Sequence, residues 1–278
     1  MKKVISMILV ITLLTLTLAA CGGNDDPDVK VLRVGMECAY APYNWMQQTS
    51  ANGAVPIYGS NEFAFGYDVM IAKYLADKIG YELEIHMIDW DSLPPAVITG
   101  AIDCVIAGMS ITADRAEVVD FTLPYYYASI VVLVNADSEY ANATGISGFS
   151  GARGTSQFNT VWYDICLPQI PGVNVQPPMD SAPAMLVALT SGACDIVVTD
   201  QPTALAAVSV YPQLKMLDFT GSADGFTVSA EEIDIGIAVQ KGNKELLDAL
   251  NDALRGLTIA DFERMMSDAI KVQPIDVD

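Results

Sequence analysis

The chain has 278 residues, of which 52% are hydrophobic, and its mean hydropathy is positive, so the composition excludes an intrinsically disordered protein. It carries 14 Lys and Arg against 34 Asp and Glu, a net charge of −20. Because nucleic-acid binding depends on cationic contacts to phosphate, this acidity argues against a nucleic-acid partner and is typical of a soluble surface.

The N-terminus has the pattern of a secretory signal peptide. Lys2 and Lys3 precede an apolar run over residues 4–20, which is too short for a spanning helix. Residues 18–21, Leu-Ala-Ala-Cys, resemble a bacterial lipobox, which implies that Cys21 is lipidated and that acyl chains hold the protein on a membrane. An ordinary signal peptide with a chance cysteine is the alternative. Residues 21–29 are predicted to be a flexible tether.

The first strand is predicted at residues 30–36, where the chain alternates. A loop over residues 37–43 leaves its carboxyl end and contains Glu37 and Tyr40, and binding sites are commonly built on such loops. A long loop over residues 47–65 either closes over a site or is decoration. A helix follows over residues 67–79, with Gly80 as its stop.

A second strand is predicted at residues 82–88, and His86 within it needs no chemical role. The loop after it contains Trp90, which is a core aromatic or a wall of a site. A helix at residues 93–99 and a buried strand at 104–107 complete a β-α-β-α-β order, which predicts a parallel sheet.

Residues 108–115 form the most informative stretch. Gly108 makes a turn, Ser110 offers a hydroxyl, and Arg115 lies in a short helical segment as the only basic residue between Lys78 and Arg153. A guanidinium beside hydroxyls and backbone donors is suited to bidentate binding of a carboxylate. The alternative is an ion pair of this arginine with a neighbouring carboxylate, Asp114, Glu117 or Asp120.

The second half repeats this organisation. The chain is expected to cross at residues 125–129 into an apolar strand, and the glycine turn with Thr155, Ser156 and Gln157 precedes a helix predicted to begin near Phe158. Residues 181–200 echo residues 93–110 and end in Asp200, which could also cap a helix that starts before Pro202. A return crossing at residues 235–239 and helices at 246–257 and 259–270 close the chain.

The cysteines after position 21 are expected to be buried free thiols rather than disulfides, because two of them lie in apolar strand-like runs; they are Cys38, Cys104, Cys166 and Cys194. We predict no metal site and no cofactor.

The stretch from Gly108 to Arg115, with Ser110 and Thr112 between them, resembles the ligand-binding segment of family 3 of the type II solute-binding proteins of ABC importers. The resemblance extends over roughly residues 32–270, although Met70 departs from it in the helix at 67–79. It implies an α/β fold of two lobes, each a mainly parallel sheet flanked by helices, with a hinge of two crossings. Lobe 1 would comprise residues 30–127 with 234–278, and lobe 2 residues 128–233.

The same resemblance implies a role for each candidate residue. The ligand carboxylate would bind Arg115, Ser110 and the turn at Thr155 and Ser156, and the ammonium would bind Asp200 and the Gly108 carbonyl. The ligand side chain would contact Glu37, Tyr40, Trp90 and Gln157. A carboxylate at position 37 disfavours an acidic ligand side chain and favours a cationic or amide-bearing one.

The resemblance therefore implies an exported lipoprotein on the outer face of the cytoplasmic membrane or in the periplasm, acting as a monomer. It would capture a free L-amino acid and deliver it to an ABC permease with its ATPase. A periplasmic dehydratase-like enzyme on the same fold and a chemosensory receptor without transport are the alternatives. The candidate residues include no nucleophile and base pair, which argues against an enzyme.

Overall fold

The computed structural model describes residues 29–274, and all of them from Val31 onward belong to one compact unit. The predicted signal peptide at residues 1–20, Cys21 and the tether up to residue 28 lie outside the described residues. Within the described part of the chain, no helix is both long enough and apolar enough to cross a membrane.

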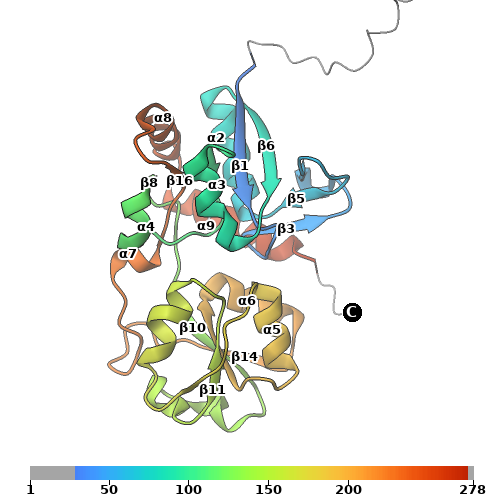
Figure 1. Cartoon of the computed structure of the whole chain (residues 1–278). Coiled ribbons are helices and arrows are strands. Elements are labelled where there is room, and N and C mark those ends of the chain that lie inside the picture. The colour runs from blue at the N-terminus through green and yellow to red at the C-terminus, as the bar shows by residue number, and fades with distance from the viewer. Residues whose placement is uncertain (1–28, 275–278) are drawn as a thin grey trace, which may run out of the picture. The chain divides into compact units, whose positions relative to one another are not determined.

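One five-stranded sheet, which we call sheet 1, is built around β1 (Val31–Met36) (Figure 1). This strand pairs in parallel with β6 (Glu82–Met87) on one side and β7 (Cys104–Val105) on the other. β16 (Ala238–Gln240) then runs antiparallel to β7 and to the edge strand β8 (Val119–Phe121). The predicted β-α-β-α-β segment is confirmed.

A second five-stranded sheet, sheet 2, has the order β12-β11-β13-β10-β14. Its parallel strands are β12 (Asn174–Val175), β11 (Arg153–Thr155) and β13 (Ile196–Asp200). β10 (Ile130–Asn135) runs antiparallel to β13 and to β14 (Leu214–Leu217). All of β13 and nearly all of β10 are buried, as their continuous apolar sequences require.

Four strands of each sheet run in the same direction and one runs against them, which confirms the predicted mainly parallel sheets. The two chain crossings explain the one antiparallel strand in each sheet. β9 (Tyr126–Tyr127) and β15 (Asp234–Ile235) pair antiparallel to each other, and β10 and β16 follow them directly. Each of these two strands therefore enters its sheet without a preceding crossover helix and runs against its neighbours. The predicted lobe boundaries at 127/128 and 233/234 fall at these paired strands and stay a prediction.

The helices largely follow the sequence pattern. α2 (Tyr67–Ile79) and α3 (Leu93–Thr99) begin and end where they were predicted, and both are capped by a left-handed glycine, Gly80 and Gly100. The other helices are α4 (Ala113–Val118), α5 (Ala182–Thr190), α6 (Gln201–Val210), α7 (Ala230–Ile233), α8 (Lys244–Leu254) and α9 (Ile259–Val272), with short turns at η2 (Trp90–Ser92), η3 (Glu139–Asn142), η4 (Ile146–Phe149) and η6 (Leu167–Gln169).

The helix predicted to start near Phe158 was placed too early. Phe158 and Asn159 lie in a turn, and the helical segment after it is a π-helix, η5 (Trp162–Cys166). Asn159 has a φ of 56°, in the left-handed region, which a right-handed helix cannot include. The loop at residues 47–65 also has structure of its own. It contributes η1 (Ala51–Gly53), β4 (Val55–Pro56) and β5 (Phe63–Phe65) to a small antiparallel sheet with β2 (Ala39–Tyr40) and β3 (Asn44–Gln47).

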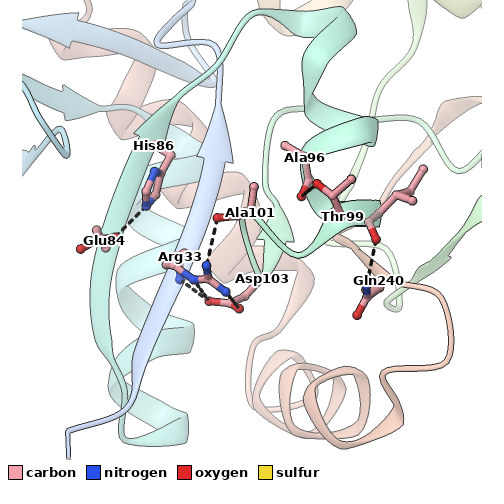
Figure 2. A network of polar contacts seen from close by, with 9 residues as sticks. Arg33, Glu84, His86, Ala96, Thr99, Ala101, Asp103 and Gln240 are labelled. Atoms are coloured by element: carbon pink, nitrogen blue, oxygen red, sulfur yellow. Dashed lines mark hydrogen bonds and ion pairs between the residues drawn. The ribbon is translucent and has the colours of Figure 1, made fainter. Parts of the chain in front are cut away.

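The same kind of ion pair occurs once in each half of the chain. Arg33 on β1 binds Asp103 with its backbone N–H, Nε and Nη2, as Figure 2 shows. Arg153 on β11 binds Asp195 with the same three groups. Each aspartate comes just before the next strand of its sheet, so the internal echo seen in the sequence corresponds to a repeated structural unit.

The remaining sequence predictions concern cysteines and the histidine. Cys38, Cys104, Cys166 and Cys194 are buried and free, as expected. His86 is half-buried on β6, where its Nε2 lies 2.7 Å from Glu84 Oε1 (Figure 2). This contact with a neighbouring side chain of the same strand accounts for His86 without a chemical role.

Candidate functional site

Seven of the ten predicted ligand-binding residues line one cavity. These residues are Glu37, Tyr40, Trp90, Gly108, Ser110, Arg115 and Gln157, and the other lining residues are Thr160, Val161 and Trp162. They follow the carboxyl ends of β1, β6, β7 and β11, so loops from both sheets meet here. The cavity measures about 10 Å³, room for about one water molecule.

A larger cavity of about 570 Å³ shares Glu37 and Trp90 with the first. Three further carboxylate residues line it, Asp89, Asp91 and Asp180. The two cavities together present one guanidinium at one end and several carboxylates at the other.

Arg115 is held by backbone carbonyls rather than by a carboxylate. Its backbone N–H is capped by the Thr112 hydroxyl at the start of α4, which fixes the first turn. Nη1 donates to the Ser110 carbonyl at 3.0 Å and Nη2 to the Asn159 carbonyl at 2.9 Å. The guanidinium also lies over the Trp90 ring, 5.2 Å from its centre, in a cation–π contact.

The alternative of a local ion pair is not what the structure has. None of the ion pairs among the described residues includes Arg115, and Asp120 instead pairs with Lys241 at 3.0 Å. Burial lowers the pKa of Arg115 to about 10, with Asp164 acting in the opposite direction. A half-buried guanidinium whose partners are neutral carbonyls favours an incoming anion.

The Gly108 turn passes directly beneath an aromatic ring. Gly108 has a φ of 60°, and a Cβ added there would lie 2.6 Å from Tyr40 Cε1. Glycine is therefore required both for the backbone conformation and for the close approach of the ring. The Gly108 N–H donates to the Tyr125 hydroxyl at 3.0 Å, which orients the turn from below.

Glu37 is a buried carboxylate at the edge of the cavity, with 9% of its surface exposed. Gln157 Nε2 donates to Glu37 Oε1 at 3.1 Å, so a residue that follows β11 contacts one that follows β1. Burial raises the pKa of Glu37 to about 7, the Gln157 hydrogen bond opposes this shift, and nearby Asp89 and Asp91 add to it. A cation placed beside Glu37 would stabilise its ionised form and so offset both the cost of burying that charge and the repulsion from Asp89 and Asp91.

Asp200 does cap a helix, as the alternative interpretation of the sequence predicted. Its Oδ1 accepts a 2.7 Å hydrogen bond from the Thr203 N–H at the start of α6. Its Oδ2 accepts a short hydrogen bond from the Tyr40 hydroxyl, which joins the two loops. Burial raises the pKa of Asp200 to about 6 against the opposing effect of these hydrogen bonds. Asp200 thus lies behind Tyr40, a lining residue, and is not itself on the cavity wall.

The hydroxyls of Thr155 and Ser156 are used within their own half of the chain. Thr155 Oγ1 donates to the Pro177 carbonyl at 2.8 Å, and Ser156 Oγ donates to the Val198 carbonyl at 2.6 Å. Their side chains are fully buried and do not line the cavity.

Sequence reasoning missed four residues here. Asn159 is one of them, because its carbonyl accepts from both Arg115 and Trp90 Nε1. Thr160, Val161 and Trp162 line the cavity directly. The sequence does show an aromatic residue, Trp162, shortly after the glycine turn. Its place on the cavity wall could not be predicted, because the helical segment begins later than expected.

The site has the chemistry of a receptor for a small charged molecule: a guanidinium, buried carboxylates and aromatic walls. Within the part of the chain that the structure describes, no group of three or more His, Cys, Asp or Glu side chains is placed to hold a metal ion.

Comparison with known proteins agrees with this description. Residues 32–261 match the family described as bacterial extracellular solute-binding proteins, family 3. A probable histidine-binding protein of Neisseria gonorrhoeae is 30% identical over 273 residues, which is 91% of this chain and 90% of the relative. An ABC transporter arginine-binding protein of Escherichia coli (strain K12) is 28% identical over 210 residues, or 76% of this chain and 83% of the relative.

Solved structures show the same fold. An ancestral arginine-binding protein bound to arginine is 31% identical, with a TM-score of 0.67, and the alignment covers 86% of this chain and 97% of that chain. The predicted α/β fold of two lobes is thereby confirmed, with mixed sheets. The matched proteins are binding proteins rather than enzymes, as predicted.

Proposed function

We infer that this chain, which belongs to the bacterial extracellular solute-binding proteins of family 3, takes as its solute a free L-amino acid with a cationic side chain, L-arginine first among them. One observation carries the proposal: a half-buried guanidinium without an ion pair among the described residues and a buried carboxylate line the same cavity. L-Arginine bears a carboxylate and a guanidinium, so it complements both groups.

Arg115 supports the carboxylate end of this proposal. Its donors face backbone carbonyls, and a carboxylate is a stronger partner for a guanidinium than a neutral oxygen. In the proposed complex Ser110 and the turn at Thr155 and Ser156 add donors, and the ammonium lies between Asp200 and the Gly108 carbonyl.

The acidic surroundings of Glu37 support a cationic ligand side chain. The charges that raise the pKa of Glu37 include those of Asp89 and Asp91, and both of these residues line the adjoining larger cavity. Tyr40 and Trp90 would pack on the aliphatic part of the side chain, with Gln157 as a polar neighbour. Relatives named for arginine, histidine and cystine binding support an amino acid as the ligand, and two of these three amino acids have a basic side chain.

The ligand would bridge the two lobes, because residues from both contact it. The ligand shifts the population toward the closed form only by its differential affinity for that form. We further propose that Cys21 carries the lipid anchor and that the closed protein delivers its ligand to an ABC permease with its ATPase.

A thermal-shift screen of the twenty amino acids on the purified protein tests the ligand class, because a ligand stabilises the folded state according to its concentration relative to its Kd. L-Arginine or another cationic amino acid should give the largest rise in Tm. Equal rises for acidic and cationic amino acids, or turnover of the ligand during incubation, would contradict the proposal.

A further inference from the structure

A fully buried carboxylate lies behind the candidate site without touching its cavity. Asp68 is the second residue of α2 and has 0% of its surface exposed. Its Oδ1 accepts a 2.7 Å hydrogen bond from the Tyr125 hydroxyl, and its Oδ2 accepts a 2.8 Å hydrogen bond from Asn44 Nδ2. Among the described residues it forms no ion pair.

Each partner of Asp68 relays one further hydrogen bond to the backbone of a binding loop. The Tyr125 hydroxyl accepts from the Gly108 N–H at 3.0 Å, and Asn44 Oδ1 accepts from the Cys38 N–H at 2.8 Å. Every hydrogen bond of the network therefore donates toward Asp68. One series of bonds begins at the Gly108 N–H and the other at the Cys38 N–H, and each ends at one carboxylate oxygen of Asp68. A centre that accepts on both sides must be a carboxylate, because an amide presents a donor on one of them.

The two backbone positions held in this way adjoin the proposed ligand contacts. Cys38 follows Glu37, and its φ of 55° shows that this loop holds a conformation which few non-glycine residues adopt. Gly108 begins the turn that leads to Ser110 and Arg115. One carboxylate thus sets the position of the two loops that carry Glu37 and Arg115.

An ionised carboxylate at this buried position lowers the stability of the fold, so stability alone does not explain an aspartate here. Burial raises the pKa of Asp68 to about 7, and its hydrogen bonds with Tyr125, Asn44 and the Gly108 backbone act against that shift. Apolar residues of similar volume commonly stabilise a core as well or better than buried charges. The position at the N-terminus of α2 gives some compensation, because the helix dipole favours a negative charge there.

We propose that Asp68 is a positioning residue of the ligand site, whose two accepting oxygens hold the Glu37 loop and the Gly108 turn in register with each other. The inference rests on the proposed function for its effect on affinity, but the effect on the two backbone amides is independent of any ligand. Asp68 acts through Asn44 and Tyr125 and does not contact the ligand.

An exchange of two residues tests the direction of the network. In Asp68→Asn one donor faces another donor, so one relay is broken. Adding Asn44→Asp restores every bond, since the carboxylate introduced at position 44 accepts from the Cys38 N–H and from the amide introduced at position 68, whose oxygen accepts from Tyr125. The single variant should bind L-arginine at least about tenfold more weakly by calorimetry, which corresponds to loss of one buried hydrogen bond, and the double variant should recover to within about threefold of wild type.

Amide hydrogen exchange by NMR provides the readout without ligand. Asp68→Asn should accelerate exchange at Gly108 or Cys38 by about tenfold, and the double variant should restore protection. Tyr125→Phe, which cuts one relay only, should accelerate exchange at Gly108 and leave Cys38 protected. This milder variant serves if Asp68→Asn does not fold.

Thr122→Val is a matched stability control. Thr122 is buried, its Oγ1 accepts from the Ile237 N–H at 3.1 Å, and that hydrogen bond involves neither binding loop. The substitution should lower Tm while leaving the Kd for L-arginine unchanged. Unaltered affinity and exchange in Asp68→Asn, or a folded double variant that stays as weak as the single one, would overturn the inference. Failure of wild type to bind L-arginine, with the exchange pattern as described, would instead overturn the proposed ligand.

Discussion

Glu37→Gln should remove most of the pH dependence of L-arginine binding. The pKa of Glu37 is raised to about 7 by burial. In the proposed complex the guanidinium of L-arginine lies beside Glu37 and is stabilised by the ionised carboxylate. With that pKa, about 90% of Glu37 is ionised at pH 8 but only about 3% at pH 5.5, so protonation of this group weakens binding about 30-fold over this interval. Affinity rises with pH, and binding near pH 6.5 should release a proton.

Other buried carboxylates titrate in the same interval, and the variant separates their effects. Asp200, with a pKa raised to about 6, is present in both proteins and is not among the charges that shift the pKa of Glu37, so its contribution cancels when the two pH changes are compared. Asp68 is also present in both proteins, and its charge contributes to the raised pKa of Glu37. Between pH 5.5 and pH 8, the fold-increase in L-arginine affinity should be about 30 times larger for wild type than for Glu37→Gln.

The assay is calorimetry with L-arginine at pH 5.5 and pH 8 on both proteins. L-Citrulline, which is nearly isosteric but has a neutral side chain, is the matched ligand control. Its affinity should not gain from ionisation of Glu37. Equal pH dependence of L-arginine binding in wild type and Glu37→Gln would refute the assignment of Glu37 to the ligand cation.

Three further outcomes are expected. Arg115→Ala should weaken binding by two to three decades, because a ligand carboxylate left without its cation costs about 3–5 kcal/mol, and micromolar binding by the folded variant would contradict its role. Gly108→Ala should weaken binding at least about tenfold, since its Cβ would lie 2.6 Å from Tyr40 Cε1, whereas Gly59→Ala, which has a φ of 72° and no neighbour within 4 Å, should cost only about 1 kcal/mol of stability in chemical denaturation. Without ligand, the unfolding free energy should fall as pH rises from about 4.5 to 7, because the buried carboxylates bind protons more tightly folded than unfolded; a rise across that interval in denaturant titrations would contradict the shifts of Glu37, Asp68 and Asp200.

Much of the fold was predictable because it follows from local patterns. The apolar face and glycine stop of α2, and the buried strand before Gly108, each require only a few neighbouring residues. The repeat of residues 93–110 in 181–200 also identified two related halves. The mainly parallel sheets were predicted, but the sequence did not show that β10 and β16 run against the other strands, because strand direction depends on where the crossings enter each sheet, which no local period encodes.

The candidate site was predictable in its loops but not in the direction of its side chains. The lone Arg115 after a buried strand was sufficient to locate the cavity. The hydroxyls of Thr155 and Ser156 donate to carbonyls of their own half of the chain, which the sequence did not show, while binding of a carboxylate by the N–H groups of this turn stays a prediction. A short hydroxyl bonds whichever acceptor is nearest, and that acceptor belongs to a strand or loop distant in sequence.

Asp68 shows how a residue's type can be set entirely by distant contacts. In the sequence it is one of 34 acidic residues, and an acid in the first turn of a helix is common because helix N-termini favour negative charge. Its hydrogen-bond partners Asn44 and Tyr125 lie 24 and 57 positions away. Only when both binding loops are folded do the Cys38 and Gly108 N–H groups orient Asn44 and Tyr125 so that both donate to position 68, which must then accept two hydrogen bonds. The same geometry explains why asparagine, which fits the space equally well, should fail at position 68 unless position 44 takes over the charge.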